Sequence, residues 1–136
     1  METKFESRVG KINSNEEKIY SFISDFNNFK KLVPEDKISN FQSSENSCKF
    51  TVPGAGEVGL KILEKIPTNT IKITGEGMSN QSFVFWVQLK SVSTDDTRIK
   101  LTIKADLNPM IKMMASKPLQ NFLDKLVDAL EKMNFN

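Results

Sequence analysis

The residue types that carry out most enzyme chemistry are scarce in this chain. It contains no histidine, which removes the commonest general base and a frequent metal ligand. Its single cysteine, Cys48, lies in the alternating run "SCKFTV", where neither a partner nor a helix N-terminus is available to lower the pKa of a thiol. We therefore interpret Cys48 as a small core residue, and we predict no metal site, no cofactor and no catalytic residue.

Carboxylates are the remaining candidates for acid and base chemistry. A buried Asp or Glu could work together with one of the two arginines, Arg8 and Arg98. Each acidic candidate lies in a polar stretch, which favours a solvated surface. The candidates are Asp25, Glu57, Glu64, Glu76 and Asp106.

Length and composition are those of an ordinary globular protein. With 136 residues, 38% of them hydrophobic and 26% charged, the chain is expected to form one domain over residues 1–136. Nineteen Lys and Arg residues against 17 Asp and Glu residues are spread along the chain, so no nucleic-acid partner is expected. The chain shows neither a signal peptide nor an apolar run of membrane-spanning length, which predicts a cytoplasmic protein without a membrane span.

The first forty residues predict an edge strand and two short helices. Residues 4–12 alternate, with Phe5 and Val9 on one face and a kink after Gly10. A capping box of Ser14 and Glu17 predicts a helix start. Apolar residues at helical spacing follow, and a second short helix is expected over residues 29–33, before a proline.

Period-two alternation from residue 37 to residue 107 predicts about six antiparallel strands. The clearest run, "TRIKLTIKADL", places Ile99, Leu101 and Ile103 on one face and lysines on the other. Turn residues at 53–56, 67–69 and 94–96 predict a meander of consecutive hairpins.

The last segment, "NPMIKMMASKPLQNFLDKLVDAL", has the spacing of an amphipathic helix long enough to cross the sheet. Pro118 should make this helix kink or restart near residues 116–117, so that residues 109–117 form a lid. Unbranched Met110, Met113 and Met114 would then line a cavity entrance. The alternative is that these methionines fill the core and that the proline only bends the helix.

Several runs resemble the START-like, or SRPBCC, superfamily, which includes the pollen-allergen, polyketide cyclase and carbon monoxide dehydrogenase CoxG families. These runs are "EEKIYSFISDFNNFKKLVP", "VPGAGEVG", "SFVFWVQL" and "KADLNPMIKMMASKPLQNFLDKLVDAL". The resemblance covers essentially the whole chain. It implies an α+β helix-grip fold, in which a curved antiparallel sheet of about seven strands wraps around the C-terminal helix and two short helices follow the first strand.

In that superfamily the sheet and the helix often enclose an apolar cavity. The resemblance therefore implies that a hydrophobic, lipid-like or polyketide-like small molecule binds there. The alternatives are a cyclase or dehydratase that uses a buried carboxylate, and a protein-interaction module with a filled core. The expected lining is Phe50, Leu60, Ile62, Ile73, Phe83, Phe85, Leu101, Ile103, Met110, Met113, Met114, Leu119 and Leu123, and the expected rim is Phe26, Phe29, Gly54 and Gly56.

The strand "SFVFWVQL" is apolar on both faces. If Phe83 and Phe85 face the cavity, Val84 and Trp86 lie on the outer face of the sheet. Large aromatic residues on such a face are common at protein contacts, which suggests a homodimer interface. The alternative is an isolated Trp shielded by the stems of neighbouring lysines.

Overall fold

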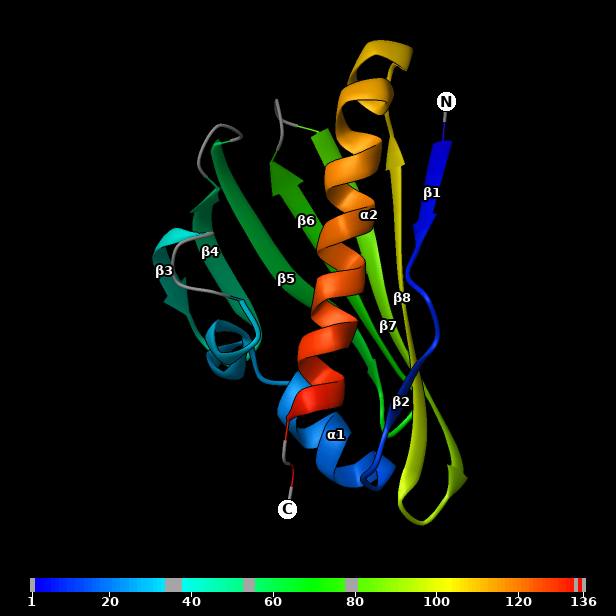
Figure 1. Ribbon diagram of the computed structural model, residues 1–136. Coiled ribbons are helices and arrows are strands. Elements are labelled where there is room, and N and C mark those ends of the chain that lie inside the picture. The colour runs from blue at the N-terminus through cyan, green and yellow to red at the C-terminus, as the bar shows by residue number, and fades with distance from the viewer. Residues whose placement is uncertain (1, 34–37, 53–55, 78–80, 134, 136) are drawn as a thin grey trace.

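The computed structural model describes residues 2–33, 38–52, 56–77, 81–133 and 135. The elements shown in Figure 1 are β1 (Glu2–Glu6), β2 (Gly10–Ile12), α1 (Glu16–Ile23), the 3₁₀ helix η1 (Phe26–Lys31), β3 (Ser39–Ser43), β4 (Ser47–Val52), β5 (Gly56–Ile66), β6 (Thr70–Gly77), β7 (Gln81–Ser93), β8 (Asp96–Asp106) and α2 (Pro109–Lys132). The predicted α+β class, with a curved antiparallel sheet and a long C-terminal helix, is confirmed.

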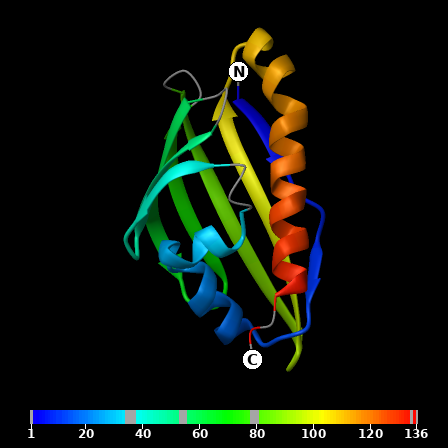
Figure 2. The same ribbon diagram turned by 60° about the vertical axis from the view of Figure 1, so that its left-hand side comes forward.

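The strands form one antiparallel sheet in the order β1-β8-β7-β6-β5-β4-β3, and β2 pairs with β8 beyond the end of β1. Strands β3 to β8 are a meander, as the turn residues predict. The turns at residues 67–69 and 94–95 lie between paired strands, and residues 53–55 lie outside the described residues. In Figure 2 the side of the sheet formed by β3 to β5 curves away from α2.

One face of the sheet, here called the inner face, is turned toward α2 and carries the core. The alternation in β8 is confirmed, since Ile99, Leu101 and Ile103 are buried in the same core cluster as Leu123 and Val127 of α2. The opposite, outer face carries mainly polar side chains. Strand pairing therefore places every inner-face residue in a row across the sheet.

The kink in the first strand is confirmed, but its position differs from the prediction. The chain leaves the ladder between β1 and β2, where the Ser7 hydroxyl accepts a hydrogen bond from the amide of Leu101 at 2.9 Å. This interruption changes the parity, so Gly10 and Ile12 are buried while Val9 is 59% exposed. The expectation that Val9 shares the buried face with Phe5 is wrong.

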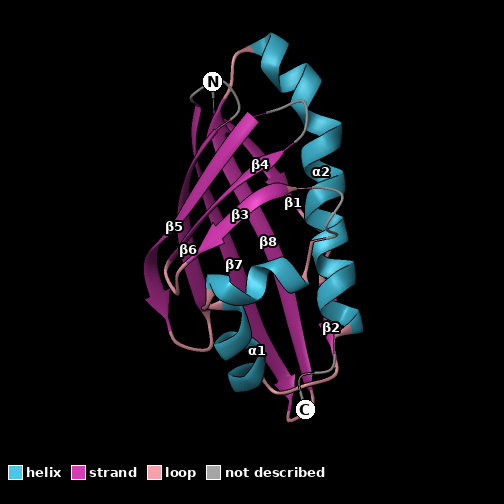
Figure 3. Cartoon of the chain, turned by 90° about the vertical axis from the view of Figure 1, so that its left-hand side faces the viewer, coloured by secondary structure: helices cyan, strands magenta, loops and turns pink. Residues whose placement is uncertain are grey.

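Helix α1 starts one residue later than the predicted capping box. Asn15 is the N-cap, and its side chain accepts a hydrogen bond from the amide of Lys18 at 2.9 Å. Ser14 is instead held against the sheet, because its carbonyl accepts a hydrogen bond from the buried Thr97 hydroxyl at 2.9 Å. Figure 3 shows α1 and η1 at the end of the sheet opposite the start of α2.

Helix α2 runs through Pro118 without interruption, so the predicted restart near residues 116–117 is wrong. Proline removes one hydrogen bond to the carbonyl four residues earlier. Pro118 and Met114 both lie on the exposed side of the helix, where water can satisfy the freed carbonyl of Met114. The helix packs against β1, β2 and β8, and its buried side chains are Ala115, Leu123, Leu126, Val127 and Leu130.

A polar network fixes the C-terminal half of α2 to the kink between β1 and β2. The Arg8 guanidinium donates to the carboxylates of Asp128 and Glu131. Glu131 also accepts from the amide of Lys11 at 2.8 Å, and Asp124 accepts from the amide of Arg8 at 3.1 Å. These bonds set the lateral position of α2 on the sheet.

This network predicts a pH-dependent contribution to stability. Hydrogen bonding to Arg8 holds the pKa of Glu131 below its ordinary value of 4.5. A lowered folded-state pKa stabilises the fold above about pH 4.5, and that stabilisation is lost as the pH falls through the lowered value. We expect Arg8→Gln to lower the thermal midpoint at pH 7, with a difference from the wild type that shrinks in acid. Thermal melts between pH 3 and pH 7 check this, with the exposed Lys90→Gln as the control; a pH-independent difference would contradict it.

Candidate functional site

The structure separates the predicted cavity lining into three groups. Six of its residues are packed in the core: Phe50, Ile73, Phe85, Leu101, Ile103 and Leu123. Four are half-buried against that core: Leu60, Ile62, Phe83 and Leu119. Three are exposed, namely Met110, Met113 and Met114, at 72%, 82% and 72%.

The three methionines do not line an enclosed space in this structure. They lie on the solvent side of the first turns of α2, while Ile111 and Ala115 of the same turns are packed toward the sheet. Helical geometry explains the division, because residues three or four apart share a face. The helical period, applied from residue 111, would have assigned Ile111 to the inner side.

The predicted rim residues on η1 belong to an aromatic cluster. Phe29 stacks on Phe41 and Phe50, with ring centroids 6.1 and 5.7 Å apart, and it meets Phe26 edge to face at 6.2 Å. This cluster fills the space between η1 and strands β3 and β4. Of the predicted glycines, Gly56 begins β5 with a φ of 100°, and Gly54 lies outside the described residues.

The inner face is less completely covered over β5 and β7. Leu60, Ile62 and Phe83 lie on this face and are half-buried, in contrast to their fully buried neighbours on β8. Because α2 packs on β1, β2 and β8, it leaves apolar surface over β5 to β7 in contact with solvent. Half-buried apolar residues of α2 complete the set: Ile111, Leu119 and Phe122.

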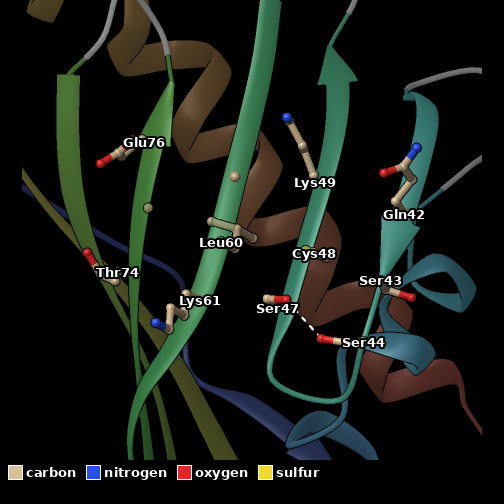
Figure 4. Close-up of a pocket in the computed structure, with 12 residues that line it drawn as sticks. Gln42, Ser43, Ser44, Ser47, Cys48, Lys49, Leu60, Lys61, Thr74 and Glu76 are labelled. Atoms are coloured by element: carbon tan, nitrogen blue, oxygen red, sulfur yellow. Dashed lines mark hydrogen bonds between the residues drawn. The ribbon is translucent and has the colours of Figure 1, made fainter.

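Two hollows lie on the outer face, and neither lies between the sheet and α2. The larger has a volume of about 570 Å³ and extends over β3 to β6. In Figure 4 the side chains of Ser47, Lys61 and Thr74 project from the side of the sheet away from α2, and the hydroxyls of Ser44 and Ser47 lie 2.8 Å apart. Sequence reasoning missed this hollow, because its polar side chains come from four strands and have the pattern of an ordinary solvated face.

The second hollow, of about 240 Å³, adjoins Trp86. Trp86 is half-buried on the outer face, with the ammonium groups of Lys72 and Lys104 5.9 and 5.6 Å from its ring centroid. Lysine side chains that cover an aromatic ring match the shielded arrangement expected as the alternative to a contact surface. A homodimer contact through Val84 and Trp86 stays a prediction.

The buried thiol has no activating partner. Burial raises the pKa of Cys48 to about 12, so the thiol is protonated at neutral pH. A protonated thiol is a poor nucleophile and a poor metal ligand. Cys48 is a buried core residue, as predicted.

The acidic candidates do not converge on the inner face. Asp25 caps η1, and Glu57 pairs with Lys49 at 3.1 Å. Glu64, Glu76 and Asp106 are exposed. Among the described residues no Asp or Glu side chain is buried, and no group of three or more His, Cys, Asp or Glu residues could hold a metal ion.

The two arginines are engaged elsewhere. Arg98 donates to Asp96 at 2.9 Å, which holds the pKa of that carboxyl below its ordinary value. Arg8 belongs to the network with α2. The arrangement of the described residues can therefore cover an apolar molecule, but it presents no catalytic pair.

The sequence matches the family model of the carbon monoxide dehydrogenase G subunit (CoxG) over residues 10–133. The chain belongs to the CoxG family. This match includes the helix-grip elements from β2 to the end of α2. A comparison with curated proteins found no match.

Solved structures confirm the fold of this CoxG-family chain. A truncated norcoclaurine synthase from Thalictrum flavum is 14% identical, with a TM-score of 0.75, and the match covers 97% of this chain and 92% of that one. A conserved protein from Geobacillus kaustophilus is 12% identical, with a TM-score of 0.73 and coverage of 97% and 93%. The Mll3558 protein from Rhizobium loti is 15% identical, with a TM-score of 0.68 and coverage of 96% of each chain. Such low identities establish shared architecture and not shared chemistry.

Among the described residues of this CoxG-family chain, no helix combines the length and the apolar character needed to cross a membrane.

Proposed function

We propose that this CoxG-family chain binds an apolar or amphipathic small molecule between α2 and the inner face of β5 to β7. The observation that carries the proposal is the half-burial of Leu60, Ile62 and Phe83 on a face that is otherwise core. A ligand that covers such surface gains about 0.8 kcal/mol for each methylene removed from water. The lack of a buried carboxylate among the described residues favours binding over catalysis.

A specific observation favours a second candidate, a protein-interaction module with a filled core. Six of the predicted lining residues are buried in contact with the core cluster, and the aromatic cluster around Phe29 fills the space beside β3 and β4. In that case the Trp86 surface on the outer face would be the contact region, and a homodimer would be the simplest form of it.

Titration of delipidated protein with N-phenyl-1-naphthylamine, whose fluorescence rises in apolar surroundings, separates the two candidates. Ligand binding predicts one saturable probe site per chain, displacement by a long-chain alcohol, and a one-to-one adduct in native mass spectrometry. A titration without saturable fluorescence, together with a bare mass, would contradict the binding function and favour the filled-core module.

A further inference from the structure

One row of residues across the inner face has unusually small side chains. Strand pairing places its members side by side from β4 to β1 in the order Cys48, Leu60, Gly75, Phe83, Ala105 and Thr3. The next row consists of large side chains, namely Ile62, Ile73, Phe85, Ile103 and Phe5. Between Leu60 and Thr3, Phe83 is therefore the one large side chain of its row.

The Phe83 ring lies directly on Gly75. A Cβ atom built on Gly75 would be 2.3 Å from Cζ and 2.5 Å from Cε2 of Phe83, and 2.9 Å from Cδ2 of Leu60. The ring therefore occupies the place that a side chain at position 75 would take, and its edge meets Leu60. Packing of an aromatic ring on a cross-strand glycine stabilises a sheet and holds the ring in one position.

The ring is half-buried, so part of it borders the uncovered surface over β5. A molecule that lies over Leu60 and Ile62 would meet the Phe83 ring before it reached Ala105. Neighbouring strands are about 4.8 Å apart, so the ring over Gly75 separates Leu60 from Ala105 by about three strand spacings.

We infer that Phe83 determines the length of the apolar chain that this protein binds, by closing the row at Gly75. The inference rests on the proposed function and adds a specificity-determining residue to it. The bound molecule extends over β4 and β5 up to the ring. Removal of the ring joins this space to the small side chains of β6 and β8.

A series of straight-chain alcohols from octanol to hexadecanol, used to displace N-phenyl-1-naphthylamine, tests this inference. In the wild type each added methylene should raise affinity about fourfold until the chain reaches the ring, where the increase stops. Phe83→Ala should move that limit to longer alcohols, with about the same gain for each methylene beyond the wild-type limit. Val84→Ala, the adjacent half-buried residue on the outer face of β7, is the matched control and should leave the limit unchanged.

The outcomes distinguish failure of the inference from failure of the proposed function. An unchanged limit in Phe83→Ala, or an equal shift in Val84→Ala, would show that the ring only stabilises the sheet. A wild type that binds neither probe nor alcohol would overturn the proposed function, and the inference with it. If circular dichroism shows that Phe83→Ala does not fold, Phe83→Leu serves instead, with a smaller extension expected.

Discussion

Replacement of Gly10 by alanine is expected to lower the free energy of unfolding by about 1–3 kcal/mol. Gly10 pairs with Ile99 beneath the C-terminal half of α2. A Cβ atom there would be 2.5 Å from Cγ1 of Val127 and 3.1 Å from Cγ2 of Ile99. Val127 is fully buried, and its branched side chain has one strongly preferred rotamer in a helix, so it cannot move aside cheaply. The helix must shift away from β2, which strains the network around Arg8.

Urea unfolding of Gly10→Ala and Gly59→Ala measures this effect against a matched control. Gly59 lies in β5, and a Cβ atom added there would have no atom within 4 Å, so alanine should be neutral or slightly stabilising. Equal free energies of unfolding for Gly10→Ala and the wild type would mean that α2 does not pack as closely on β2 as the structure shows.

Gly75→Val is expected to weaken binding of N-phenyl-1-naphthylamine at least tenfold, or about 1.4 kcal/mol. The first carbon of a side chain at position 75 already overlaps the Phe83 ring. The ring must therefore leave its position and enter the space over Leu60 and Ile62, which is the proposed binding surface. Valine itself favours a strand, so a largely intact sheet is expected.

Gly59→Val is the control for this variant, because it adds the same side chain to the outer face of a neighbouring strand. A fluorescence titration of both proteins, with thermal melts to verify folding, gives the comparison. If Gly75→Val binds the probe as the wild type does, the probe lies elsewhere, and the hollow over β3 to β6 becomes the surface to mutate next.

The distribution of apolar surface explains why binding is favoured over catalysis for this CoxG-family chain. The carboxylates that an acid or base mechanism would need lie on the outer face or at caps, as with Asp25 at η1 and Glu57 beside Lys49. The incompletely covered part of the inner face is instead apolar and comes from β5, β7 and α2. A site of this kind recognises shape and chain length more than charge.

Periodicity by itself determined the elements of this protein and the direction of their faces. The alternation of Ile99, Leu101 and Ile103 predicted a buried face, because successive side chains of a strand point to opposite sides and only one side of this sheet is covered. The helical spacing of Leu123, Leu126 and Leu130 predicted the buried stripe of α2 for the same kind of reason. These patterns are local, so a single sequence is enough to show them.

Only the tertiary structure decided which apolar residues are packed and which stay open to solvent. The lateral position of α2 depends on its contacts with the kink between β1 and β2, including the bonds of Arg8 to Asp128 and Glu131, which join residues far apart in the sequence. That position buries Leu101 and leaves Leu60 half-buried, although both have the same pattern in the sequence. The pairing of Gly75 with Phe83 likewise depends on strand register, which neither residue indicates alone.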